Sequence, residues 1–172
     1  MSYLVLARKW RPKLFNEVVG QQHVVQALQN SILNKKINQA YIFNGTRGVG
    51  KTSIARILTK VLNCKNPKNG EPCNECDQCL AMNENSLLDF QEIDAASRRS
   101  REETMNLLET VPYLPTSSKY KVYLIDEVHM LTKESFNALL KTLEEPPPHV
   151  IFMFATTEIE KVPPTILSRC LQ

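Results

Sequence analysis

Residues 45–52 combine three glycines with a lysine and a threonine in the order G-x-x-x-x-G-K-[ST]. Glycine lets the backbone wrap around a polyphosphate so that several N–H groups point toward it. The apolar run 40–43 precedes this stretch, and apolar residues at helical spacing follow it between positions 54 and 61. This strand–loop–helix context predicts a nucleoside triphosphate site, with a simple glycine turn as the alternative.

The residues of this loop have different predicted roles. Lys51 is expected to reach the β- and γ-phosphates, and the Thr52 hydroxyl is expected to bind Mg²⁺. A helix that begins near Lys51 adds the positive end of its dipole. The residues expected to contact the nucleotide here are Gly45, Gly48, Val49, Gly50, Lys51, Thr52 and Ser53.

Two acidic residues, Asp126 and Glu127, follow the apolar run Val122–Ile125. If this run is a buried strand that ends beside the phosphate loop, Asp126 can hold Mg²⁺ directly or through water. Glu127 can then act as general base on the attacking water. The alternative is an acidic pair that caps the next helix. Together with the loop, the pair favours hydrolysis, because a plain nucleoside kinase needs no water-activating glutamate.

Four of the five cysteines lie within residues 64–79, a segment with almost no apolar core of its own. Four thiolates suit tetrahedral Zn²⁺, and two C-x2-C steps let successive sulfurs turn toward one ion. The pattern predicts a closed structural zinc site in a reducing compartment, which would stabilise the segment. Disulfides, free core thiols or an iron–sulfur cluster are the alternatives. The predicted ligands are Cys64, Cys73, Cys76 and Cys79.

Two further groups of polar residues lie close to predicted strands. Ser97–Arg101 contains three arginines, including Arg98, where a helix begins. Positive charge opposes the helix dipole there, which suggests a nearby anion such as nucleic-acid phosphate, or else a solvated cluster offset by neighbouring glutamates. Thr157 closes the strand after position 150, where a side chain could report the γ-phosphate. Arg169 lies in Ser168–Cys170, to which composition alone assigns no role.

The bulk composition limits the class of protein. The chain has 172 residues, of which 42% are hydrophobic, and this is enough for one domain with a small insertion. The formal net charge of +3 does not by itself indicate a nucleic-acid partner. No apolar stretch approaches 18 residues, and residues 1–11 lack the features of a signal peptide, so no membrane span is expected.

Alternating strands and helices must position these groups. Periodicity predicts helices over 21–33, 52–63, 100–108 and 133–144, and strands over 40–44, 89–93, 122–125 and 150–155. This alternation implies an α/β fold of three αβα layers, with a mostly parallel sheet covered on both faces. Ligands of such sheets bind at the carboxyl ends of the strands, where the phosphate-loop and acidic-pair motifs lie.

Taken together, the motifs resemble a known family. Ala7–Pro12 followed by Val18–Gln21 resembles the opening box of clamp-loader ATPases, and Ser168–Cys170 is similar to their serine-arginine-cysteine signature. Residues 45–52 resemble their Walker A motif, and residues 122–127 resemble their Walker B motif. The cysteine module, Asp126–Leu131 and Leu140–Pro147 narrow the resemblance to the gamma/tau subunits of bacterial DNA polymerase III, which are AAA+ ATPases. The related delta-prime subunit lacks a competent phosphate loop, whereas this chain has one.

This resemblance implies roles for individual residues. Thr157 would be the γ-phosphate sensor, and Arg169 would be an arginine finger that acts on the ATP of a neighbouring subunit. Arg98 would face the inner chamber of the assembly and touch duplex phosphates. The implied cofactors are ATP, Mg²⁺ and Zn²⁺. The residues that border the adenine would be Arg11, Pro12, Val18 and Val19.

The resemblance also implies a function and partners. The function would be ATP-driven loading of a sliding clamp onto primed DNA, in the bacterial cytoplasm and within the DNA polymerase III holoenzyme, which is a nucleotidyltransferase. The partners would be the delta and delta-prime subunits, further gamma/tau copies, the clamp and primed DNA, with no membrane. A stand-alone P-loop phosphotransferase and a non-catalytic, zinc-stapled ATP-binding module remain as alternatives.

Finally, the resemblance implies a domain organisation. Residues 1–172 would form the AAA+ ATPase domain, with the zinc module 64–79 inserted into it. The fifth strand, the lid domain and the collar domain of the family would lie outside this sequence. The first strand, 40–44, would then be an unprotected edge. Without the lid and a neighbour's arginine finger, the chain alone is expected to bind nucleotide weakly and to turn over little or none.

Overall fold

The computed structural model describes residues 10–97 and 100–172, and its centre is a parallel sheet of four strands. The strands are β1 (Ala40–Asn44), β2 (Phe90–Asp94), β3 (Lys121–Asp126) and β4 (Val150–Thr156), and they lie in the order β1-β4-β3-β2. All three strand pairs are parallel. The predicted strands are confirmed to within about a residue at most ends, as expected for short apolar runs bounded by polar residues.

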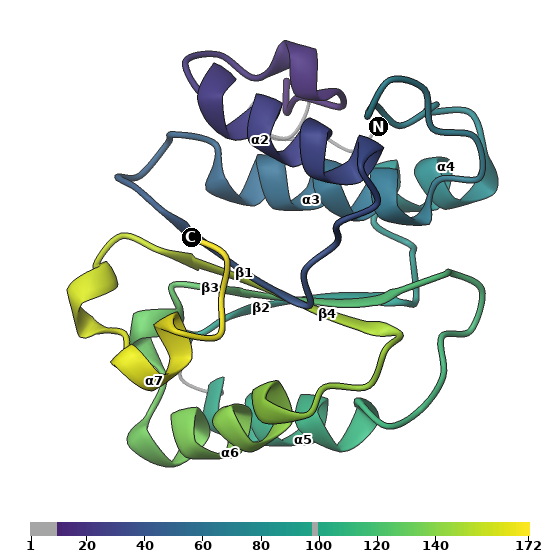
Figure 1. The fold of residues 1–172 in the computed structure, drawn as a ribbon. Coiled ribbons are helices and arrows are strands. Elements are labelled where there is room, and N and C mark those ends of the chain that lie inside the picture. Colours follow the sequence, from purple (N-terminus) through teal and green to yellow (C-terminus); the bar gives the residue numbers. More distant parts are fainter. Residues whose placement is uncertain (1–9, 98–99) are drawn as a thin grey trace, which may run out of the picture.

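Helices cover both faces of this sheet, so the fold has the three layers that the alternating pattern predicts (Figure 1). On one face lie α2 (Gln22–Leu33), α3 (Lys51–Asn63) and α4 (Asp77–Asn83). On the other lie α5 (Ser100–Thr110), α6 (Lys133–Glu144) and the short α7 (Pro164–Leu167). Single turns of 3₁₀ helix are η1 (Phe15–Glu17), η2 (Val128–Met130) and η3 (Ile159–Lys161). Within the described ranges, no helix combines the length and apolar character that crossing a bilayer requires.

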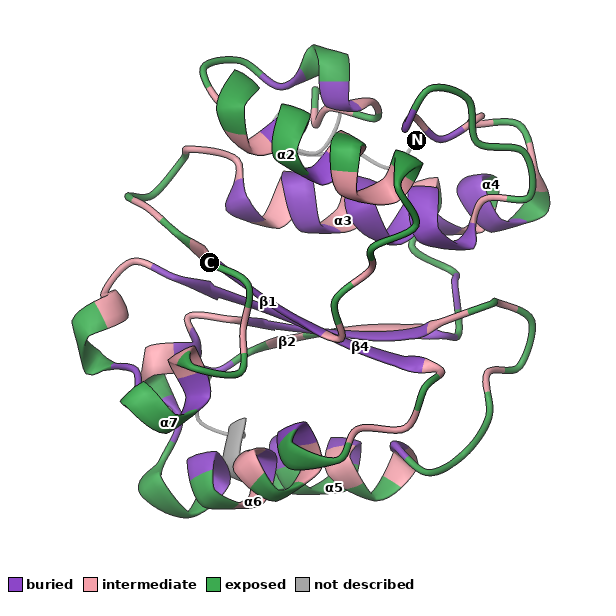
Figure 2. Ribbon diagram, in the orientation of Figure 1, coloured by how far each residue is buried: buried purple, intermediate pink, exposed green. Residues whose placement is uncertain are grey.

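The two central strands, β3 and β4, are almost wholly buried (Figure 2). Their side chains alternate between two cores, because successive residues of a strand point to opposite faces. On β4, Met153 belongs to the core under α3, whereas Phe152 and Phe154 belong to the core against α6. The Phe152 ring also stacks on Tyr123 of β3, with centroids 5.5 Å apart. This packing fixes the carboxyl ends of the strands from which the polar groups project.

The outer edge of β1 is paired, so the expectation that it would be unprotected is wrong. Leu171 lies parallel to Tyr41 in an isolated bridge. The Ile42 N–H donates to the Leu171 carbonyl at 2.8 Å, and the Leu171 N–H donates to the Ala40 carbonyl at 2.9 Å. The chain after α7 therefore returns to the sheet and satisfies two polar groups of the edge.

Candidate nucleotide site and metal centre

Residues 45–50 connect the end of β1 to the start of α3 and form the glycine-rich loop. Gly48 and Gly50 have φ angles of 81° and 93°, which glycine adopts without steric cost. A side chain at Gly45 would place its Cβ 2.9 Å from Val49 Cγ2. The Gly45 N–H also donates to the Thr156 carbonyl at 3.2 Å, which ties the loop to the end of β4. Each glycine of the motif thus occupies a position where a side chain would be strained or crowded.

The Lys51 ammonium lies inside this loop. Its Nζ donates to the carbonyls of Gly45 at 2.7 Å and Thr46 at 2.8 Å, and the residue is 9% exposed. Thr52 and Ser53 follow in the first turn of α3, and both are half-buried. A buried ammonium beside the N-terminus of a thirteen-residue helix is an environment that favours an anion.

Asp126 ends β3, and Asp94 at the end of β2 is its partner in the strand register. Burial raises the pKa of the Asp126 carboxyl, and the nearby carboxylates of Glu127, Asp94 and Glu92 add to this effect. The Glu127 N–H donates to Asp126 Oδ1 at 2.9 Å and opposes it. A divalent cation offsets this kind of crowding of negative charge, so Asp126 fits the predicted role of Mg²⁺ ligand.

Glu127 lies in a small polar network at the ends of β3 and β4. Its φ of 52° is uncommon for a residue other than glycine. Thr157 Oγ1 donates to Glu127 Oε2 at 3.2 Å, so two residues predicted from separate motifs are brought together. His129 Nε2 lies 3.4 Å from the same oxygen and 3.1 Å from Glu158 Oε2. His129 Nδ1 is 2.8 Å from Thr156 Oγ1.

The sequence motifs indicate no role for His129, whose side chain is 4% exposed. Its Nε2 faces carboxylate oxygens of both Glu127 and Glu158. The imidazole therefore bridges the turn after β3 and the residues that close β4. The available signal is a histidine two residues after a strand-end acidic pair, but only the fold shows which groups it meets.

An apolar cavity of about 360 Å³ lies beside the glycine-rich loop, where Val49 and Lys51 form part of its wall. Its size and mostly apolar lining suit a flat heterocycle such as a nucleotide base. No sequence motif predicts this cavity, because its walls come from distant parts of the chain. Other lining residues are Val24, Leu28, Tyr41, Ile159 and Leu171.

The residues predicted to border the adenine are not among those that line this apolar cavity. Arg11 and Pro12 line a second cavity of about 550 Å³, whose wall includes Asp126. Val18 is 8% exposed and belongs to the core under α2, whereas the neighbouring Val19 is 89% exposed. Contact between these four residues and a base stays a prediction.

Arg169 lies after α7 and is held there by two contacts. Its guanidinium donates to the Thr165 carbonyl at 2.8 Å and to Glu144 Oε1 at 3.2 Å. The side chain remains 35% exposed. Its contacts within the described part of the chain join it to α6 and α7, not to the glycine-rich loop, which is compatible with action on a neighbouring subunit. Arg98, the predicted DNA contact, is outside the described residues.

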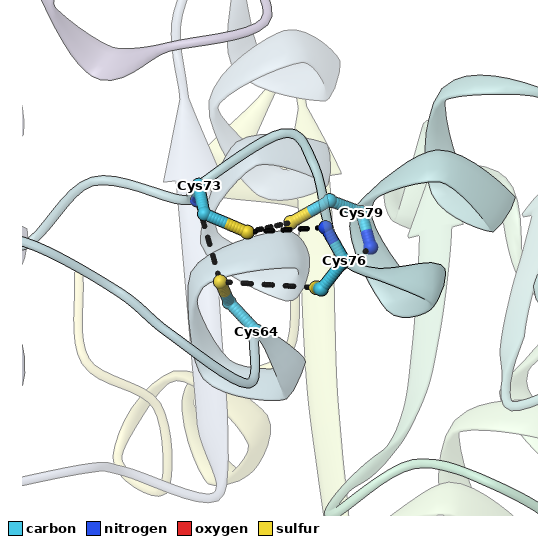
Figure 3. A group of neighbouring side chains, drawn as sticks. All are labelled: Cys64, Cys73, Cys76 and Cys79. Atoms are coloured by element: carbon cyan, nitrogen blue, oxygen red, sulfur yellow. Dashed lines mark hydrogen bonds between the residues drawn. The ribbon is translucent and has the colours of Figure 1, made fainter.

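The four cysteines of the module meet at one point (Figure 3). Their sulfurs all lie within 4.8 Å of one another, with Cys73 to Cys79 and Cys64 to Cys76 both at 4.0 Å. A ZnS₄ tetrahedron with bonds of about 2.3 Å has edges of about 3.8 Å, so the arrangement fits Zn²⁺. None of the four is in a disulfide in the described structure. The prediction that these residues form one cluster is confirmed.

Backbone N–H groups point at several of these sulfurs. The N–H groups of Glu75 and Cys76 donate to Cys73 Sγ and lower the pKa of that thiol to about 6. Burial raises the pKa of Cys64 and of Cys79. Four thiolates this close require a cation to offset their mutual repulsion, so the chemistry of the donor set also fits a metal.

The sequence of this chain matches a family of DNA polymerase III subunits and several of its members. Residues 20–172 match the family described as DNA polymerase III, delta subunit. The chain belongs to this family. It is 58% identical over 172 residues to DNA polymerase III subunit tau/gamma of Haemophilus influenzae, and 59% identical over 172 residues to subunit tau of Escherichia coli K12. Within that family, these full-length matches of the chain are to tau/gamma subunits. The chain spans 25% and 27% of the length of these two relatives.

Solved structures share the fold at lower identity. A DNA polymerase III gamma subunit-related protein of Thermotoga maritima superposes with a TM-score of 0.62 at 21% identity, over 85% of this chain and 43% of that one. The RuvB Holliday junction branch migration motor of the same organism gives 0.57 at 19% identity, over 93% and 46%. Both likenesses show that these proteins share the parallel-sheet α/β fold of this chain.

Proposed function

We propose that this chain is the ATP-binding and hydrolysing domain of a bacterial clamp loader, which loads a sliding clamp onto primed DNA during chromosome replication. The observation that carries the proposal is the hydrogen bond from Thr157 to Glu127. Glu127 follows Asp126, and both lie at the same carboxyl end of the parallel sheet as the glycine-rich loop. Thr157 follows β4, to which the loop is hydrogen-bonded. A base, its orienting partner and a phosphate-binding loop are the parts that triphosphate hydrolysis requires.

Nucleotide binding would use groups that already lie in place. The Lys51 ammonium would exchange the carbonyls of Gly45 and Thr46 for β- and γ-phosphate oxygens. The Thr52 hydroxyl and Asp126 would hold Mg²⁺, which supplies neutralisation of phosphate charge when bound. The apolar cavity next to Val49 would receive the base.

Hydrolysis would use Glu127 as the general base. Both Thr157 and His129 face its Oε2, so Oε1 is the oxygen that would take a proton from the attacking water. Two partners on one oxygen restrict rotation of the carboxylate, which favours a fixed position for that water. When nucleotide binds, the Thr157 hydroxyl would transfer its single O–H donor from Glu127 to the γ-phosphate, and His129 would remain beside Oε2.

Other residues would act within the assembly. Arg169 would stabilise the transition state at the site of a neighbouring subunit; its side chain is 35% exposed, and its contacts are with α6 and α7. Arg98 would contact duplex phosphates. The zinc site would be structural. The partners would be delta, delta-prime and further gamma/tau subunits, the clamp and primed DNA, and the chain alone would turn over ATP poorly.

The test is ATP turnover by the assembled complex with Glu127→Gln, measured with and without primed DNA. We expect turnover to fall by about 100-fold or more, while MgATP binding persists, because the amide cannot accept the proton. Glu160→Gln is the matched control, since Glu160 is exposed in η3. Full turnover by the Glu127→Gln complex would reject the proposed role. Turnover that required an added acceptor substrate would favour a phosphotransferase instead.

A further inference from the structure

The zinc module contacts a distant N-terminal segment, residues 11–18, through one carboxylate. The N–H groups of Phe15 and Asn16 donate to Glu71 at 2.8 and 3.0 Å. Gln29 of α2 donates to the same carboxylate at 3.1 Å. The N–H groups of the two preceding residues of the segment are taken by Glu17. Glu71 thus receives half of the N–H groups at the entry to η1.

A second link runs through Lys60, which is on α3 and is 3% exposed. Its Nζ donates to the Lys13 carbonyl at 2.7 Å. The same ammonium donates to Asn74 Oδ1 at 2.7 Å and to Asn83 Oδ1 at 2.9 Å. Asn74 lies between two of the cysteine ligands. One buried cation therefore joins the N-terminal segment, α3 and the zinc module.

Glu71 is held by a tight turn next to the metal ligands. Lys68 and Glu71 exchange both backbone hydrogen bonds, at 3.0 and 2.9 Å. The two residues between them, Asn69 and Gly70, have φ angles of 53° and 75°, as a type I′ turn requires. Cys73 follows two residues later, so an ion that fixes this sulfur also fixes the exit of the turn.

The N-terminal segment in turn contributes to the core and to a cavity wall. Phe15 is 1% exposed and packs in the core on the α3 side of the sheet. Arg11 and Pro12 line the cavity that also contains Asp126. The position of these residues relative to the strand ends therefore depends on contacts with the zinc module.

We propose that the zinc module holds the N-terminal segment in place and that Glu71 is its positioning residue. With zinc bound, Glu71 holds residues 11–18 against α3, and loss of zinc releases them. Release would weaken nucleotide binding, and this second part rests on the proposed function of the chain. The position of the segment itself can be measured without nucleotide.

The experiment compares Glu71→Gln with Glu75→Gln in the full chain, saturated with zinc. Both variants remove one charge from the module, but Glu75 is exposed and only its backbone N–H contacts Cys73. Amide hydrogen exchange at Phe15 and Asn16 should be at least about tenfold faster in Glu71→Gln, because each N–H loses a charged acceptor. Glu75→Gln should match wild type, and metal analysis should find the same zinc content in all three proteins.

Zinc removal tests the same attachment of the N-terminal segment without a substitution. Chelation of wild type should speed exchange at Phe15 and Asn16 by a similar factor. Unchanged exchange at these amides in Glu71→Gln, or after zinc is shown to have left wild type, would overturn the proposal. Titration with MgATP tests whether release of residues 11–18 weakens nucleotide binding. Equal affinity of Glu71→Gln and wild type for MgATP would overturn this second part of the proposal. If wild type binds no MgATP, the proposed function fails. The exchange data still test whether the zinc module holds residues 11–18 in place.

Discussion

Gly70 offers a sharp test of how tightly the turn of the zinc module packs. An alanine Cβ at this position would lie 3.1 Å from Cβ and Cγ of Gln29, and 3.3 Å from its Cα. Because Gln29 lies within α2 and its Cα belongs to the backbone, relief requires movement of the helix or of the turn. Gly70 also has a φ of 75°, which an L-residue adopts only at a cost.

The two costs can be separated with Gly20→Ala. Gly20 has a φ of 80°, and an added Cβ there would meet nothing within 4 Å. Its substitution should cost about 0.5–1.5 kcal/mol of unfolding free energy, since backbone strain is partly offset by reduced entropy of the unfolded chain. Gly70→Ala should cost about 1.5–4.5 kcal/mol, because overpacking against α2 adds about 1–3 kcal/mol to the same backbone cost.

The assay is urea denaturation of the zinc-saturated chain, with the m-value as a check that the unfolding transition is unchanged. Gly70→Ala should also speed amide exchange at Phe15 and Asn16, because Glu71 moves with the turn. Equal destabilisation by the two substitutions would refute the reasoning, since it would mean that the contact with Gln29 carries no energy.

Three other perturbations have defined outcomes. Asp89 accepts the N–H groups of Thr116, Ser117 and Ser118 at 2.7–2.9 Å, and these bonds outweigh the effect of burial and lower its pKa. Asp89→Asn should cost about 2–3 kcal/mol in urea denaturation at pH 7. The difference from wild type should begin to shrink below about pH 4, the pKa of the carboxyl in the unfolded chain, and should vanish as the pH falls through the lower pKa of the folded state. Arg169→Lys should lower ATP turnover of the assembled complex by about a thousandfold with MgATP affinity retained, because lysine lacks the guanidinium fork; a change in affinity alone would argue against a finger. Metal analysis should find one zinc ion per chain, and zinc uptake at pH 7 should release protons from the thiols whose pKa burial raises; uptake without proton release would contradict thiolate ligation.

The parts of this protein that the sequence predicted well depend on local geometry. The steps from Cys73 to Cys76 and from Cys76 to Cys79 bring sulfurs together over a single turn, so the cluster follows from spacing. The apolar run before Asp126 places this residue at the carboxyl end of a buried strand, and the glycines shape the phosphate loop. Each of these groups is positioned by residues that are close in sequence.

The parts that escaped prediction depend on tertiary packing. Glu71 meets Phe15 across 56 positions of sequence, and no periodicity relates two such residues. Leu171 and Tyr41, which pair in an isolated bridge, both line the cavity beside Val49. The sequence did not predict that the chain after α7 returns to β1. His129 acquires its partners only when η2 turns it toward the end of β4.

The other outer strand of the sheet, β2, bears on how the protein avoids aggregation while it folds. A parallel edge strand presents unpaired N–H and C=O groups to any second chain that can add a strand. The side chains of β2 are half-buried or exposed and include Gln91, Glu92 and Asp94, with Glu92 in an ion pair of 2.7 Å to Arg56. A strand added there would have to bury these carboxylates, so the charges that crowd Asp126 also guard this edge against aggregation.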